Sequence, residues 1–255
     1  MKPSAVAWHR AASLDDAVAA LRDDPSAMPL AGGQSLVAML GLRVTAAERL
    51  VGIAHLPELA SVSENAGVLR IGAGVTHAAI EDGRIPDATD GLLAHVASGI
   101  AYRAIRNLGT IGGSLALCDP AADWPVALLA LDATVITTTR DIAIADFLRG
   151  AYATALTQGE LIRAVEILRF APGTRWGATR IARQAGAFAD SLCVAVHRPG
   201  APPRIALGAT GRGAVLLASS TPEAIGAADP DADSFRRRCH LAAATRAVRQ
   251  MKRPA

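Results

Sequence analysis

The chain has 255 residues, of which 51% are hydrophobic and 19% are charged. This apolar content supports a sizeable buried core. It also excludes disorder as the main state, because a disordered chain is charge-rich and poor in aliphatic residues. The formal net charge of +3 is too small to indicate a protein that binds nucleic acid or an anionic membrane.

The sequence carries no signal for a metal site, a leader segment or a membrane span. Its cysteines (Cys118, Cys193 and Cys239) are odd in number, far apart and without CxxC spacing, so we expect neither a disulfide framework nor a zinc or iron–sulfur site in this chain. Residues 1–18 contain charges where a signal peptide needs an apolar stretch, and no apolar run reaches the roughly 18 residues of a transmembrane helix. We therefore expect a cytoplasmic protein.

The first part of the chain alternates helical and extended patterns. Ser13 is suited to cap a helix over residues 13–22, where apolar side chains recur at helical spacing, and Asp24-Pro25 is expected to end it. Residues 28–44 predict a short strand, a glycine turn and a second apolar element. The next predicted elements are strands over 49–53 and 67–71 and a helix over 92–101.

Three features mark the middle of the chain. Residues 103–117 predict a polar turn flanked by apolar runs. Asp119-Pro120 is typical of an N-cap followed by proline at the first helical position, which predicts a helix through Pro125 to about residue 131. Residues 132–140 are rich in β-branched side chains and predict a strand.

From about residue 151 the pattern changes to several strands and a final helix. The predicted elements are strands over 161–170, 191–198 and 204–211, turns at 172–173, 177 and 199–203, and a basic helix over 234–251. The run Arg236-Arg237-Arg238 predicts a solvated helix face, or one that a partner subunit covers. The chain is thus predicted to be α+β, with a separate α+β unit at its C-terminal end.

Two diglycine segments are the first candidates for a binding site. Gly32-Gly33 is followed by Gln34 and Ser35, and Gly112-Gly113 lies between Thr110 and Ser114. Adjacent glycines allow main-chain N–H groups to converge on an anion such as a diphosphate. Taken alone, the first segment favours an ordinary turn between apolar elements, and a single glycine loop is weak evidence for a binding site. Together, and without lysine, the two segments favour a long ligand held at more than one point, while the missing GxxxxGK(S/T) pattern disfavours a nucleoside triphosphate.

Other polar residues leave alternatives open. The segment Gly72–His77 imitates a dinucleotide fingerprint, but His77 replaces its third glycine, so we do not assign a Rossmann fold. Helix capping explains much of Asp119, whereas Asp123 lies one turn further on and is suited to bind a ribose or ribityl hydroxyl. Arg180 and Arg183 follow the turn predicted at 177 and are either surface charges or ligand contacts.

Three segments in this order resemble the FAD-binding medium subunit of the molybdenum hydroxylases, the group of carbon monoxide, xanthine and aldehyde dehydrogenases: AGGQSLVAMLGLR, IGAGVTH and RAIRNLGTIGGSLALCDPAADWPVALLALDA. The resemblance continues through GELIRAVEI and ends with SFRRRCHLAAATRAV. It implies an α+β protein with a two-subdomain FAD-binding fold of the vanillyl-alcohol-oxidase type, followed by a C-terminal three-stranded antiparallel sheet with a helical bundle. The implied domains are residues 1–56, 57–150 and 151–255.

The resemblance also implies a set of FAD contacts. It places the diphosphate loop on residues 30–37, the second loop on residues 110–114 and the acidic ligand on Asp123. Many members have lysine at the position of Arg180, and a planar guanidinium is not equivalent to an ammonium. The complete set of implied contacts is Leu30, Ala31, Gly32, Gly33, Gln34, Ser35, Leu36, Val37, Thr76, Ile100, Gly109, Thr110, Ile111, Gly112, Gly113, Ser114, Asp119, Asp123, Leu161, Ile162 and Arg180.

The implied activity is oxidoreduction in which FAD carries the redox chemistry. We therefore expect no catalytic side chain and no metal ligand in this chain. Electrons from a molybdenum cofactor in a large subunit would cross two 2Fe–2S clusters in a small subunit to reach this FAD, and then pass to an external acceptor. The implied assembly is a dimer of heterotrimers. The alternatives are a stand-alone FAD-dependent oxidoreductase on the same fold and a non-catalytic nucleotide-binding module.

Overall fold

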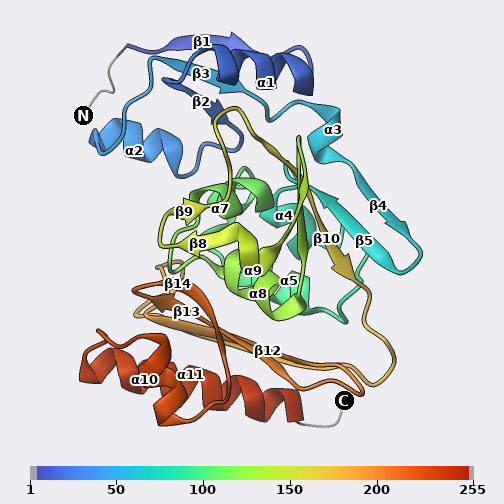
Figure 1. The fold of residues 1–255 in the computed structure, drawn as a ribbon, viewed down its shortest axis with the longest axis vertical. Coiled ribbons are helices and arrows are strands. Elements are labelled where there is room, and N and C mark those ends of the chain that lie inside the picture. The colour runs from blue at the N-terminus through green and yellow to red at the C-terminus, as the bar shows by residue number, and fades with distance from the viewer. Residues whose placement is uncertain (1–4, 253–255) are drawn as a thin grey trace.

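The computed structural model describes residues 5–252, in which three units of helices and strands are stacked along the long axis of the molecule (Figure 1). Residues 1–4 and 253–255, which the predicted first and last domains include, lie outside the described residues. Residues 1–4 also belong to the segment 1–18 that was assessed for a signal peptide.

The N-terminal unit is a parallel sheet with two crossover helices. Its strands β1 (Ala7–Arg10), β2 (Ala27–Leu30) and β3 (Arg49–Gly52) are ordered β1-β3-β2, and the helices are α1 (Leu14–Asp23) and α2 (Leu36–Leu42). The Ser13 hydroxyl accepts a hydrogen bond from the Asp16 N–H at 3.1 Å, so Ser13 is the helix cap that the sequence predicts. By contrast, no residue of α2 is buried.

The middle unit is a five-stranded antiparallel sheet with short helices around it. The strands, in sheet order, are β4 (Val62–Asn65), β5 (Val68–Gly72), β10 (Ile162–Leu168), β6 (Thr134–Thr137) and β7 (Asp141–Ala143). The helices are α3 (Pro57–Ala60), α4 (His77–Glu81), α5 (Leu92–Gly99), α6 (Arg103–Arg106), α7 (Ile111–Leu117), α8 (Asp123–Leu131) and α9 (Ile144–Phe147), and a hairpin is formed by β8 (Leu148–Gly150) and β9 (Ala153–Thr154). The central strand β10 comes from beyond residue 150, so this sheet draws on two of the three predicted domains. The domain division stays a prediction.

The buried helix α8 starts three residues later than the sequence predicts. The carboxylate of Asp119 accepts from the Ala121 N–H at 2.8 Å and closes a turn, and it does not cap a helix. The Pro120 carbonyl accepts from the Ala209 N–H at 2.7 Å, so it is not available to the first turn of a helix. The helix therefore begins at Asp123, and all its later residues are buried.

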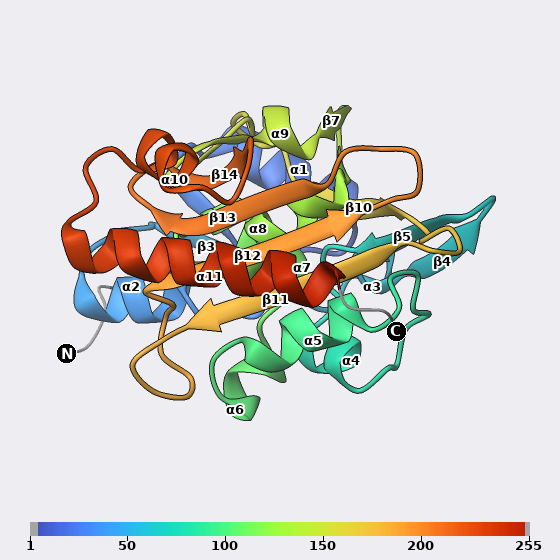
Figure 2. The ribbon, with the colours of Figure 1, turned by 90° about the horizontal axis from the view of Figure 1, so that it is seen from below.

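The C-terminal unit has four antiparallel strands, where the sequence predicted three. They are β11 (Arg175–Ile181), β12 (Ser191–His197), β13 (Arg204–Thr210) and β14 (Gly213–Leu217). Neither β11 nor β14 was predicted as a strand from the sequence. Strand β14 forms because a tight turn after Thr210 folds the chain back onto β13. Helices α10 (Pro222–Ala228) and α11 (Ser234–Lys252) follow, and α11 crosses the outer face of the sheet (Figure 2). The three arginines at residues 236–238 are exposed on α11.

Strand β12 is buried on both faces. Leu192, Val194 and Val196 belong to the core that contains α8, whereas Cys193 and Ala195 pack with the apolar face of α11. Side chains alternate across a strand, so a strand between two helical layers has to be continuously apolar. This packing joins the C-terminal sheet to the middle unit.

The turn predicted at Gly177 is wrong, because Gly177 lies inside strand β11. A Cβ atom at this position would lie 2.1 Å from the carbonyl oxygen of Ala247 in α11. The glycine therefore allows a close approach of helix to strand.

Among residues 5–252, no helix is both long and apolar enough to cross a membrane, and no group of three or more His, Cys, Asp or Glu side chains is arranged to hold a metal ion. The three cysteines are buried and free.

Candidate cofactor-binding site

A cavity of about 700 Å³ lies where the three units meet. Its walls come from β2 and the turn before α2, from α7 and the start of α8, and from the loops before β10 and after β11. Cavities that hold cofactors and other small molecules usually measure about 300–1,000 Å³. Its volume and apolar lining therefore suit a cofactor or another small molecule.

The first glycine turn leads from β2 to α2 and forms one wall of this cavity. A Cβ atom at Gly32 would lie 1.8 Å from the carbonyl oxygen of Leu108, so glycine is required for the turn to pack against the segment before α7. Gly33 has φ +69°, a left-handed conformation that favours glycine. The Gln34 amide donates to the Gly32 carbonyl at 2.9 Å and holds the turn closed.

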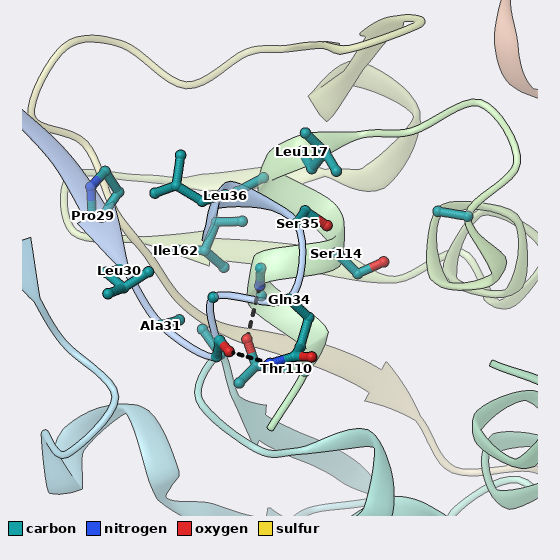
Figure 3. Close-up of a pocket in the computed structure, with 18 of the residues that line it drawn as sticks. Pro29, Leu30, Ala31, Gln34, Ser35, Leu36, Thr110, Ser114, Leu117 and Ile162 are labelled. Carbon is teal, nitrogen blue, oxygen red and sulfur yellow. Dashed lines mark hydrogen bonds between the residues drawn. The ribbon is translucent and has the colours of Figure 1, made fainter. Parts of the chain in front are cut away.

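The second glycine segment is part of a helix, which corrects the predicted polar turn. Thr110 is the N-cap of α7, and its hydroxyl accepts from the Gly113 N–H at 3.0 Å. Glycine lowers helix propensity, but this cap and the complete burial of Ile111 and Leu115 outweigh that cost. Figure 3 shows Gln34 and Ser35 of the first turn beside Thr110 and Ser114 of the helix. The two diglycine segments thus share one cavity.

An ion pair closes the end of the cavity toward the C-terminal sheet. The Arg180 Nε donates to Asp123 Oδ1 at 3.2 Å, and the Arg180 Nη2 donates to the Ala187 carbonyl. Burial raises the pKa of Asp123 to about 6, although the guanidinium acts in the opposite direction. Arg183, in contrast, is an exposed surface charge 3.8 Å from Asp190.

His77 lines the cavity and was not predicted as a site residue. The Trp124 indole Nε1 donates to His77 Nδ1 at 3.0 Å. An indole N–H only donates, so Nδ1 is the acceptor and the neutral imidazole carries its proton on Nε2. Burial lowers the pKa of His77 to about 4, with a smaller contribution from Arg106, so the ring is neutral at pH 7. The sequence signal was its position in the glycine segment 72–77.

Most of the predicted FAD contacts line this cavity, and three do not. Val37 is 54% exposed, Ile111 is buried in the core, and the Thr76 hydroxyl caps α4 by accepting from the Ala79 N–H. The predicted contacts that line the cavity are Leu30, Ala31, Gly32, Gly33, Gln34, Ser35, Leu36, Ile100, Gly109, Thr110, Gly112, Gly113, Ser114, Asp119, Asp123, Leu161, Ile162 and Arg180.

The loop before β10 forms another wall, of which only Leu161 was predicted from the sequence. It is anchored by Glu160, which accepts at 2.7 Å from the hydroxyls of Thr137 and Thr139 and also pairs with Arg140. Burial acts to raise the pKa of Glu160, but these hydrogen bonds outweigh burial and hold the pKa well below its usual value. The loop after β11 also contributes to the lining, through residues 186–188.

The three-unit fold and its shared cavity are typical of a protein that binds a cofactor or another small molecule. Residues 4–167 match the family model described as the FAD binding domain in molybdopterin dehydrogenase. The chain belongs to this family: it is an FAD-binding medium subunit of the molybdenum hydroxylases, and therefore a subunit of an oxidoreductase whose cofactor here is FAD.

Known proteins resemble the chain over most of its length. The glyceraldehyde dehydrogenase medium chain of Sulfolobus acidocaldarius is 34% identical over 205 residues, which cover 78% of this chain and 73% of the relative. The carbon monoxide dehydrogenase medium chain of Hydrogenophaga pseudoflava is 34% identical over 203 residues, or 78% of this chain and 71% of the relative.

Two solved structures share the whole fold. One is the carbon monoxide dehydrogenase of Hydrogenophaga pseudoflava that lacks the Mo-pyranopterin moiety of the molybdenum cofactor, with a TM-score of 0.92, 29% identity and 98% of both chains covered. The other is quinoline 2-oxidoreductase from Pseudomonas putida 86, with a TM-score of 0.88, 30% identity and 98% of both chains covered.

Proposed function

We propose that the 700 Å³ cavity holds FAD and that the chain relays electrons through it, from an iron–sulfur partner subunit to an external acceptor. The observation that carries the proposal is that two diglycine segments, Gly32-Gly33 and Gly112-Gly113, come from separate units and line a single cavity. We propose that FAD contacts those residues of the predicted set that line this cavity.

The residues of the cavity fit the parts of FAD. The diphosphate requires hydrogen-bond donors and close approach, which the main chain offers where glycines carry no Cβ. The two ring systems require apolar walls, and Leu30, Ile100 and Ile162 supply aliphatic ones. FAD supplies the electron-transfer chemistry when bound, and the side chains bind it, orient it and exclude water.

We assign the flavin ring to the end of the cavity that contains Arg180 and Asp123. The Arg180 side chain is 21% exposed, and its guanidinium provides positive charge beside the ring, where it would stabilise electron density added on reduction. The carboxylate of Asp123 orients that guanidinium through Nε. The proposal keeps Arg180 as a contact of FAD, with a guanidinium where the resemblance implies an ammonium in many members.

The relatives are named as medium chains, which supports a place for this chain in a complex of several subunits. We propose a large subunit with the molybdenum cofactor and a small subunit with two 2Fe–2S clusters, assembled as a dimer of heterotrimers in the cytoplasm. The three-domain division of the sequence, with two FAD subdomains and a C-terminal domain, is retained as part of this proposal.

Spectroscopy of the purified full chain, combined with affinity capture from the native cell, tests the function. We expect flavin absorption bands, uptake of added FAD, and capture of two further subunits containing molybdenum and iron. A colourless chain that takes up no FAD would refute the proposal in favour of a nucleotide-binding module. An FAD-loaded chain that oxidises a substrate without partner subunits would instead indicate a stand-alone oxidoreductase.

A further inference from the structure

The segment Ile100-Ala101 is a strained wall of the large cavity. Ala101 has φ +42°, in the left-handed region that residues other than glycine avoid. Both residues line the large cavity near Arg180, whose Cδ lies 3.6 Å from the Cβ position of Gly99. Ala101 also lines a second, more open cavity of about 520 Å³ that adjoins the large one. The segment therefore needs an external restraint to keep its shape.

Arg106 provides this restraint. Its Nη1 donates to the carbonyl oxygens of Ile100 and Ala101, both at 2.9 Å. The Arg106 side chain is 12% exposed and lies behind the wall, since it borders the smaller cavity and is absent from the lining of the larger one. It therefore acts on the large cavity through the two carbonyl groups.

Glu81 of α4 fixes Arg106 in turn. The Arg106 Nε donates to Glu81 Oε2 at 2.7 Å, and Nη2 donates to Oε1 at 2.9 Å, which is a bidentate pair. The hydrogen bonds from Arg106 lower the pKa of Glu81, so the carboxylate is charged at neutral pH. Four of the five guanidinium N–H groups are thus used, two on the wall and two on the carboxylate.

We propose that Glu81 and Arg106 are positioning residues for the flavin ring, because they hold the Ile100-Ala101 wall against the ring end of the cavity. This inference rests on the proposed FAD site. A lysine at position 106 would keep the charge but lose the fork that reaches two carbonyls and one carboxylate at once. The wall would then relax from its positive φ, and the ring would lose contacts and restraint.

The test measures FAD binding by the full chain carrying Arg106→Lys or Glu81→Gln. The readouts are the FAD dissociation constant by fluorescence titration and the visible circular dichroism of the bound flavin, which reports how the ring is held. We expect each variant to weaken FAD binding about tenfold and to alter the dichroism. The matched control is Arg84→Gln, which removes an arginine that is 59% exposed and bonds to Asp82, and should change neither readout.

A second substitution separates positioning from general destabilisation. Glycine adopts a positive φ without strain, so Ala101→Gly should reduce the need for the restraint. We therefore expect Arg106→Lys to weaken FAD binding less in the Ala101→Gly background than in the parent. Should Arg106→Lys alone fail to fold, the comparison is made with Glu81→Gln.

The outcomes distinguish this inference from the function itself. If the parent binds no FAD, the proposed function fails. If the parent binds FAD and both variants keep its affinity and dichroism, the positioning role is refuted while the proposed function stands. If Arg106→Lys weakens FAD binding equally in the parent and in the Ala101→Gly background, the positioning role is also refuted, because the loss would then not depend on the backbone strain at Ala101.

Discussion

Gly112 and Gly113 are neighbours in α7 with different surroundings, and alanine at each should therefore have different consequences. A Cβ atom at Gly112 would lie 2.5 Å from the Cβ of Ala73 and 2.7 Å from its carbonyl oxygen. Such overpacking against main chain costs about 1–3 kcal/mol of unfolding free energy. At Gly113 the nearest atom would be the Thr110 hydroxyl oxygen at 3.0 Å, and alanine raises helix propensity by up to about 1 kcal/mol.

We therefore expect Gly113→Ala to keep the stability of the FAD-free chain within about 1 kcal/mol while weakening FAD binding. The added methyl group occupies space at the cavity wall where the diphosphate would approach. Losing one hydrogen bond to a charged group costs about 1.5–3 kcal/mol, which raises the dissociation constant roughly tenfold to a hundredfold. Gly112→Ala should instead lower the stability of the FAD-free chain.

Urea unfolding of the FAD-free chain and fluorescence titration with FAD measure the two effects separately. The prediction requires that Gly113→Ala lose affinity for FAD while it keeps the stability of the parent, and that Gly112→Ala lose stability. If Gly113→Ala binds FAD as tightly as the parent, the diphosphate is not held at this position of α7, and the assignment of the second glycine segment is wrong.

Three further predictions concern buried polar groups. Burial raises the pKa of Asp123 from 3.8 to about 6, so the native state holds this proton to a higher pH than the unfolded state does. The free energy of unfolding should therefore fall as the pH rises through this range. Asp123→Asn should remove this fall when urea unfolding is measured from pH 4 to 7, and an unchanged slope would contradict the assignment. Trp124→Phe leaves His77 Nδ1 buried without its donor and should cost about 1–3 kcal/mol in urea unfolding, whereas a variant as stable as the parent would show that this bond is not needed. Glu160→Gln replaces a carboxylate that accepts several hydrogen bonds, so the loop before β10 should become more sensitive to limited proteolysis; equal cleavage rates would refute its anchoring role.

Local signals explain which elements the sequence predicted well. Helix α1 has a capping hydroxyl at Ser13, a stop at Asp24-Pro25 and one apolar face, all within a dozen residues. The long apolar strand β12 was predicted because its burial on two faces makes it continuously hydrophobic. In both cases the deciding contacts are visible in the order of side chains along the chain.

Tertiary contacts decided the elements that were missed. Two adjacent glycines argue against a helix, and α7 forms because Ile111 and Leu115 are buried, with α7 packed against α8 and β10. The place of β10 depends on pairing with β5, about 90 residues earlier, which no local pattern reveals. Gly177 looked like a turn because its real partner, the backbone of α11, lies about 70 residues further along the chain.

In the candidate site, too, local motifs were predicted from the sequence and tertiary contacts were missed. Its glycine segments are local motifs, so the sequence identified them and the structure brings them into one cavity. His77, Glu160 and Arg106 act through side chains that bond to residues at least 23 positions away, namely Trp124, Thr137 and Glu81. Their residue types alone say nothing of these contacts, and burial has to be known before the pKa shifts of His77 and Glu160 can be inferred.

The charges of the cavity explain why glycines are central to it. Its charged lining residues are Arg180 and the acids Asp119, Asp123 and Glu160, while His77 is neutral at pH 7. Arg180 is already paired with Asp123, so the described lining offers no free cationic side chain to a diphosphate. The negative charge of FAD must then be met by main-chain N–H groups, which act only at hydrogen-bond distance. Since this contact depends on close approach and not on long-range attraction, salt should weaken FAD binding little, and a side chain added at the glycines should weaken it strongly.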